Sequence, residues 1–179
     1  MRRSMVVMVI GIALVASACG GAVDKISAEI AEKAIEASGE GAVDVDVSGE
    51  GDDLSVNIET EDGSVSIGGD SELPDDLGVP VPEGGNVTTS GTQDSAAFAA
   101  VEFSQDRYDE LVSFYENWTA SDDEEWEAST ATIDMGGETQ RSAQWFAGSS
   151  AILVSDCFSL SGEGDGGLTA ACVTISKDR

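Results

Sequence analysis

The chain has 179 residues, which is enough for one ordinary domain or two small ones. It carries 35 Asp and Glu residues against 8 Lys and Arg, so its formal net charge is −27 at pH 7. It contains no histidine, which excludes Ser-His-Asp and Cys-His catalytic groups and histidine-ligated metal sites. The acidity argues against nucleic acid as a partner, because a polyanion repels phosphate groups.

The first nineteen residues have the three-part pattern of an export signal. Arg2 and Arg3 form a basic start, and an apolar stretch over residues 5–16 follows them. This stretch has about 12 residues, short of the roughly 20 that a membrane-spanning helix needs. We therefore expect residues 1–18 to be a signal peptide that is removed.

Small residues surround the first cysteine, since Ala16, Ser17 and Ala18 precede Cys19 and two glycines follow it. This segment resembles the lipobox of bacterial lipoproteins, although that family usually has Leu, Val or Ile where Ala16 stands. The resemblance implies that Cys19 carries fatty acids such as palmitate and begins the mature protein, with 19–23 as a lipidated tether. It also implies anchorage at the extracytoplasmic face of the cell membrane. The alternative is an ordinary signal peptide followed by a buried or paired cysteine.

Residues 24–68 are predicted to form a small acidic αβββ unit. Apolar residues four apart indicate a helix over 24–38. Three short segments that alternate aliphatic and polar residues predict strands at 43–48, 54–59 and 64–67. Because one face of these strands is aliphatic and the other acidic, we expect the helix to cover the aliphatic face.

Residues 69–95 contain all three prolines of the chain, together with many Gly, Ser and Thr residues. This composition is typical of a linker between two folded units. Two pieces, at 73–77 and 79–82, are more apolar than a spacer requires. The alternative is that these pieces pack along the edge of a sheet.

Residues 96–179 are predicted to form a second unit in which one helix packs on an antiparallel sheet, in the order βαββββ. The helix is expected from Gln105 to Trp118, with a buried stripe at Tyr108, Leu111, Val112, Tyr115 and Trp118. Strands are expected at 96–103, 125–135, 138–148, 151–160 and 168–176. A shift of the apolar phase within 125–135 indicates a β-bulge or a strand whose boundary differs from the one predicted. The predicted fold class of the whole chain is α+β.

Cys157 and Cys172 are the two cysteines that remain beyond the signal region. In an exported protein such a pair is expected to form a disulfide. The segments around them predict a β-hairpin, and placing Leu160 opposite Thr169 puts Cys157 opposite Cys172, within reach of a disulfide. Two free thiols are the alternative.

Three short motifs are similar to those of secreted lipoproteins of unknown function from actinobacteria. They lie at Leu73–Asp76, Val79–Gly84 and Phe114–Tyr115. The resemblance implies an exported lipoprotein from such a bacterium. It implies no catalytic or ligand-binding residues.

The segment that begins at Asp44 imitates the first half of a calcium-binding EF-hand loop. Its twelfth position is Ser55, where a calcium loop has a bidentate glutamate, and no flanking helices fit the motif. Four aspartates remain candidates for a weak divalent-cation site: Asp44, Asp46, Asp52 and Asp53.

These observations favour a lipid-anchored protein of the cell envelope that acts as a non-catalytic accessory or binding module. Its expected partners are the membrane, through the lipid on Cys19, and an unidentified envelope protein, with no nucleic acid and no cofactor. A calcium-binding lipoprotein is the alternative hypothesis. A hydrolase is a third, less favoured one, because no residue in the sequence stands out as a nucleophile.

Overall fold

The computed structural model describes residues 44–48, 55–68, 71–135, 138–158 and 168–178. These residues form nine strands, one α-helix and a single 3-10 turn. The strands are β1 (Asp44–Ser48), β2 (Ser55–Thr60), β3 (Gly63–Gly68), β4 (Asn86–Gln93), β5 (Ala96–Ser104), β6 (Glu127–Met135), β7 (Glu138–Ala147), β8 (Ser150–Cys157) and β9 (Ala170–Asp178). The 3-10 turn η2 (Gln105–Arg107) leads directly into the helix α3 (Tyr108–Ser121).

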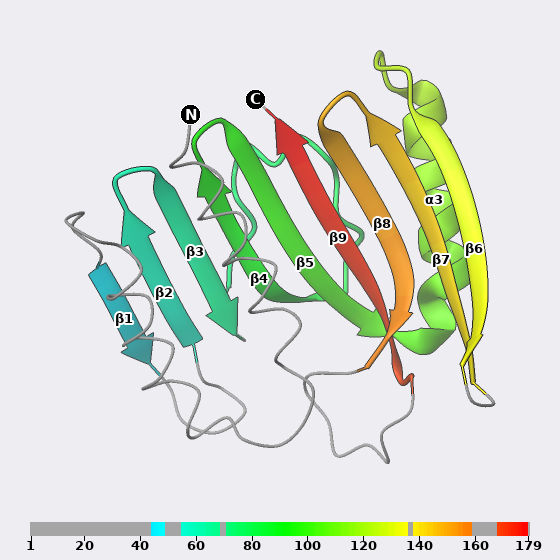
Figure 1. The fold of residues 1–179 in the computed structure, drawn as a ribbon, viewed down its shortest axis with the longest axis horizontal. Coiled ribbons are helices and arrows are strands. Elements are labelled where there is room, and N and C mark those ends of the chain that lie inside the picture. Colours follow the sequence, from blue (N-terminus) through cyan, green and yellow to red (C-terminus); the bar gives the residue numbers. More distant parts are fainter. Residues whose placement is uncertain (1–43, 49–54, 69–70, 136–137, 159–167, 179) are drawn as a thin grey trace.

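All nine strands belong to one antiparallel sheet, in the order β1-β2-β3-β4-β5-β9-β8-β7-β6 (Figure 1). The predicted α+β class is therefore wrong, because the described fold is nearly all β: its nine strands form one continuous ladder with a single α-helix beside it. Strands β1 to β3 join the remaining strands through β4. The helix predicted over 24–38 lies outside the described residues.

The segment read as a linker, 69–95, is partly a strand of this sheet. Its second half forms β4, which pairs with β3 on one side and with β5 on the other. Residues 71–85, here called the strap, pass behind β4, β5 and β9 in Figure 1. Leu77 and Val79 of the strap are buried in the core. The apolar pieces thus pack against the face of the sheet, whereas the sequence suggested an edge as the alternative to a linker.

The main core lies between the sheet and a cover formed by α3 and the strap. We call the side of the sheet that they cover the core face. Alternate residues of β5 and β9 point to it, as shown by the fully buried pair Val101 and Val173. The helix contributes Leu111 and Tyr115, both fully buried, so the predicted apolar stripe is confirmed as core.

Two polar contacts hold the strap against the helix α3 and the 3-10 turn before it. The Tyr115 hydroxyl donates a hydrogen bond to the Pro80 carbonyl oxygen at 3.1 Å. The Arg107 guanidinium donates to the Glu83 carbonyl oxygen at 2.6 Å and lies 5.0 Å from the ring centre of Phe103. The strap is thereby held by the helix at one point and by the turn before the helix at another.

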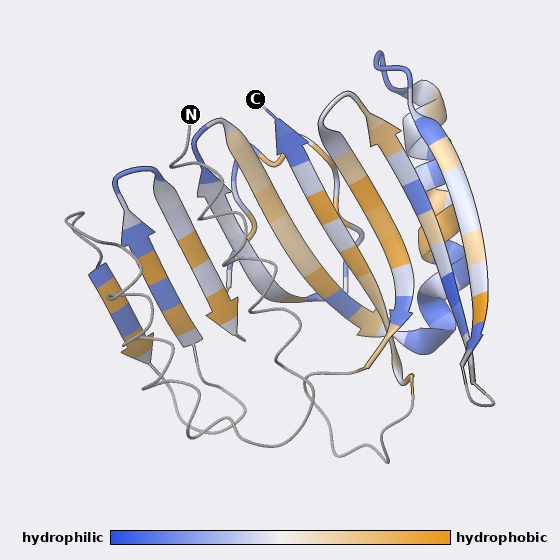
Figure 2. Ribbon diagram, in the orientation of Figure 1, coloured by the Kyte–Doolittle hydropathy of each residue, from blue (hydrophilic) through white to orange (hydrophobic). Residues whose placement is uncertain are grey.

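The polarity of the two sheet faces reverses between β5 and β1. On the core face, one row of cross-strand partners runs from Ala99 to Ser90, Ser66, Asn57 and Asp46, so it changes from apolar to acidic. On the opposite face the aliphatic residues of β1, β2 and β3 are aligned: Val45, Val47, Val56, Ile58, Val65 and Ile67. Figure 2 shows the alternating hydrophobic and hydrophilic bands along these strands. The three strands therefore continue the sheet without extending its main core.

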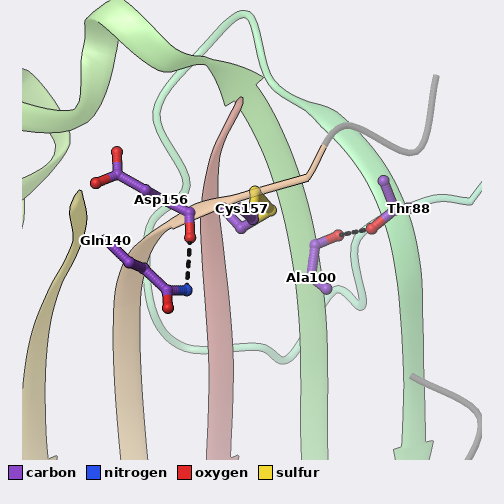
Figure 3. Close-up of a disulfide and its surroundings, with 6 residues drawn as sticks. Thr88, Ala100, Gln140, Asp156 and Cys157 are labelled. Atoms are coloured by element: carbon purple, nitrogen blue, oxygen red, sulfur yellow. Dashed lines mark hydrogen bonds between the residues drawn. A yellow bond between two sulfur atoms is a disulfide. The ribbon is translucent and has the colours of Figure 1, made fainter. Parts of the chain in front are cut away.

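The β-bulge proposed for 125–135 is absent from the pairing of β6 with β7, and the strand begins at Glu127, two residues later than predicted. The pairing of β6 with β7 is uninterrupted from Glu127 to Met135, and Trp126 precedes the strand. A register shift occurs instead in β4, between Val87 and Thr89. There the Thr88 hydroxyl donates to the Ala100 carbonyl oxygen at 3.2 Å (Figure 3).

Candidate binding surface

The most distinctive exposed feature is β6, which forms one edge of the sheet. Each described position from 127 to 134 is exposed, including positions on both faces of the strand. Its sequence, EASTATIDM, has no proline and no lysine, the residues with which proteins usually block an edge. Its two charged residues, Glu127 and Asp134, stand near the ends, and the side chain of Ile133 is 54% exposed.

The position of this edge is set by contacts at the start of the strand. The Trp126 indole donates to Asp122 Oδ2 at 2.8 Å, and its ring lies edge-on against Trp118 of the helix, with ring centres 5.5 Å apart. Lys177 approaches the same ring from β9 and forms an ion pair with Glu124. The chain therefore leaves the helix at a fixed point, and β6 continues beyond the covered core.

The other edge of the sheet, β1, has a different character. It is five residues long and presents Asp44 and Asp46. Asp44 lies directly opposite Glu59 on β2, so two like charges face each other. A short, acidic strand is poorly suited to pairing with a further chain. Of the two edges, β6 is the one whose length and composition permit such pairing.

A polar recess of about 310 Å³ lies on the core face of β2, β3 and β4, beside the strap. Its hydroxyl-bearing walls come from Ser64, Ser66, Ser90 and Thr92, and two carboxylates, Glu59 and Glu72, also line it. The hydroxyl groups of Ser66 and Ser71 share a hydrogen bond of 3.1 Å. The recess can offer hydrogen bonds to a small polar molecule.

A buried ion pair lies beside the first residue of α3. Asp156 is 1% exposed and binds the guanidinium of Arg141, which stacks 3.9 Å from the ring centre of Tyr108. Hydrogen bonds from Arg141 hold the pKa of Asp156 below its usual value, and the same bonds raise the pKa of Arg141. This cluster connects β7, β8 and α3, and its charged atoms are already engaged with one another.

The predicted cysteine pair is brought together. The sulfur atoms of Cys157 and Cys172 lie at disulfide distance, 2.00 Å, with the Cα atoms 5.9 Å apart (Figure 3). The predicted register is wrong by two residues, since Cys157 faces Ala170 and Cys172 faces Ser155. The pair is therefore diagonal, on the sheet face opposite the core face.

The remaining predicted site residues are only partly within the described regions. Cys19, Asp52 and Asp53 lie outside them. Asp44 and Asp46 are in β1, where they alternate with valines as strand residues. Within the described ranges no group of three or more acidic or cysteine side chains is placed to hold a metal ion.

The exposed edge could not be identified from the sequence. Residues 127–135 read as an ordinary strand, and nothing local shows that β6 is last in the sheet order. The weak signal is compositional: its small and hydroxyl-bearing residues lack the aliphatic alternation of a strand that covers a core.

The chain matches no protein-family model, no curated protein and no solved structure. Among the described residues no helix is both long and apolar enough to cross a membrane.

Proposed function

We propose that this protein is a non-catalytic binding module, held at the extracytoplasmic face of a bacterial membrane by a lipid on Cys19. The anchoring part of the proposal is supported by the lipobox-like sequence around Cys19 and the apolar segment before it. Two fatty-acid chains suffice for stable attachment, whereas a single chain gives only reversible binding. The high negative charge keeps the rest of the molecule soluble beside an anionic membrane surface.

The binding part of the proposal is carried by one observation, the edge strand β6, which is exposed at each position from 127 to 134. An edge strand offers a row of backbone N–H and C=O groups that can pair with another chain. The strand belongs to a sheet whose neighbouring strands are tied to a packed core, so its geometry is fixed before a partner arrives. Such preorganisation lowers the entropic cost of binding.

Anchoring is tested by detergent phase partitioning of the full-length protein expressed in an actinobacterial host. The wild type should enter the detergent phase, and Cys19→Ser should move to the aqueous phase. Cys157→Ser is the matched control, because it removes a cysteine without affecting the lipobox. If the Cys19→Ser protein stays in the detergent phase, the lipid anchor on Cys19 is wrong.

Binding is tested in the same cells with a photoreactive amino acid placed at Ser129, in the middle of β6. The control position is Glu116, an exposed residue of α3. A discrete crosslinked product at Ser129, absent at Glu116, would support a binding module that uses this edge. Equal crosslinking at both positions, or none at either, would contradict it.

A further inference from the structure

We infer that β6 receives an extended segment of a partner protein whose basic residues lie seven positions apart, and that this segment adds a tenth strand to the described sheet. The inference rests on the proposed function and specifies the chemistry of the partner. It depends on three properties of β6: its place at the edge, its uncharged centre and the two acids that bound that centre.

The backbone of β6 decides the conformation of the occupant. One side of the strand pairs with β7 over nine consecutive residue pairs, so half of its backbone groups are already bonded. No described segment pairs on the other side. An added strand can satisfy those groups only if it is itself extended.

The centre of the strand sets the side chains that fit. Between Glu127 and Asp134 the residues are Ala, Ser, Thr, Ala, Thr and Ile, exposed on both faces. Opposite such positions, β-branched residues such as Thr and Val pack well and stay extended. A partner segment with charges in its centre would find no counter-charge along these six positions.

The two acids set the charge of the occupant and exclude a second copy of this chain. Pairing residues 127–134 with the same residues of a second copy places Glu127 beside Asp134 in the antiparallel arrangement. The parallel arrangement places Glu127 beside another Glu127. Both arrangements place like charges opposite each other across the new strand pair, which is destabilising. Each copy also carries a net charge of −27. Basic residues on the partner avoid this repulsion.

The spacing of the acids sets the spacing of the partner's basic residues. Glu127 and Asp134 are seven residues apart, or about 23 Å along a strand. Because seven is odd, the two carboxylates project from opposite faces of the sheet. A matching segment therefore carries its two basic residues seven positions apart, also on opposite faces.

The test measures binding of fluorescent peptides to the full-length protein in detergent. The probe is an eight-residue peptide of alternating Thr and Val between two terminal lysines, KTVTVTVK. Peptides with terminal glutamates, or with N-methyl groups on every central backbone nitrogen, are the controls. The lysine peptide should bind at least ~10-fold more tightly than the glutamate peptide, and N-methylation should abolish binding because it removes the ladder hydrogen bonds.

A charge reversal on the protein separates edge pairing from general attraction to an acidic surface. The double variant Glu127→Lys, Asp134→Lys changes two exposed side chains and should reverse the preference, so that the glutamate peptide binds more tightly. Hydrogen exchange should show new protection within β6 when the matching peptide is bound. Unchanged preference in the variant, or equal binding of the N-methylated peptide, would overturn the inference.

Sedimentation of the protein alone tests whether a second copy of the chain occupies the edge. A dimer that persists at physiological salt and is abolished by Ala131→Pro would show that a second copy occupies the edge, against the inference. Failure of the proposed function is distinguishable. If the lysine peptide binds but no crosslink forms at Ser129 in cells, the proposed function is refuted and the inferred chemistry of the edge stands. If a crosslink forms at Ser129 but the lysine peptide does not bind, only the inferred partner chemistry is refuted.

Discussion

Arg141 donates three hydrogen bonds to the carboxylate of Asp156 on the neighbouring strand. The Arg141 side chain donates from Nε to Oδ2 and from Nη2 to Oδ1, each at 2.9 Å, and its backbone N–H donates to Oδ2 at 2.8 Å. The Gln140 side-chain amide donates to the Asp156 backbone carbonyl at 3.0 Å, as Figure 3 shows. The same guanidinium stacks on Tyr108 at the start of α3. One buried carboxylate thus fixes the end of β8, the beginning of β7 and the entry to the helix.

Loss of the arginine should destabilise the protein substantially. Arg141→Met leaves Asp156 buried without its cationic partner, which costs about 3 kcal/mol of unfolding free energy, the lower end for a buried pair. The lower end applies because the Arg141 side chain is 36% exposed. Urea unfolding followed by tryptophan fluorescence measures the loss. Arg107→Met, which removes an ion pair with the exposed Glu110 and the hydrogen bond to the Glu83 carbonyl, is the control and should cost less.

The same pair predicts acid sensitivity. Because Arg141 lowers the pKa of Asp156 in the folded protein, the contact contributes stability above the ordinary Asp pKa of about 4 and loses it as the pH falls through the lowered value. Many other carboxylates titrate in this range, so the comparison is with the double variant Arg141→Met, Asp156→Leu. Unfolding free energies from pH 7 to pH 3 should fall more steeply for the wild type. Parallel curves would show that the pair contributes no pH dependence.

Reduction of the cysteine pair should weaken the hairpin of β8 and β9. Cys157 and Cys172 are separated by 15 residues, and closing a loop of this size contributes about 3 kcal/mol to stability. Cys157→Ser should lower the unfolding free energy by about that amount. Wild-type protein in a thiol reductant should unfold at the same denaturant concentration as the variant. If reductant leaves the wild-type midpoint unchanged, the two thiols are not joined in solution.

Local patterns in the sequence were sufficient to place individual elements. The stripe that includes Leu111 and Tyr115 predicts the helix correctly, and the strict alternation around Val45 and Val56 predicts β1 and β2. Both signals arise because one side of the element is apolar, and this property can be recognised within a short segment of the sequence. Relationships between elements are not contained in such a segment.

The errors concern these longer-range relationships. The strand β4 has the sequence NVTTSGTQ, whose polar and glycine residues resemble a linker. The reversal of sheet polarity from Ala99 to Asp46 made the acidic strands look like a separate unit. The position of β6 at the edge is a matter of strand order. In each case the deciding information is which strand lies beside which.

The strap should loosen when the hydroxyl of Tyr115 is removed. Tyr115 is fully buried, its burial raises its pKa, and its hydroxyl bonds to the Pro80 carbonyl. Tyr115→Phe keeps the ring in the core and should cost about 1 kcal/mol. Hydrogen exchange should quicken at the Leu77 amide, which bonds within the strap, more than in β9. Tyr108→Phe is the control, since it removes a hydroxyl from the same helix that does not bond to Pro80. Equal exchange changes in both variants would contradict a specific role for Tyr115.

The junction of β3 and β4 depends on a glycine at position 91. A Cβ atom there would lie 2.2 Å from the Ser64 carbonyl oxygen and 2.7 Å from the Phe98 ring, so Gly91→Ala must displace backbone. Overpacking of this kind costs about 1–3 kcal/mol.

The effect of Gly91→Ala should be local, because β1 to β3 join the sheet through this junction and add little to the main core. Amide exchange should quicken in β2 and β3 and remain slow in β5 and β9. Thr89→Ala, on the same strand, adds no atom and should leave exchange in all four strands close to that of the wild type. If Gly91→Ala quickens exchange equally in β2 and β9, the sheet unfolds as one cooperative unit, and the acidic strands are an integral part of its stability despite the reversed polarity of their faces.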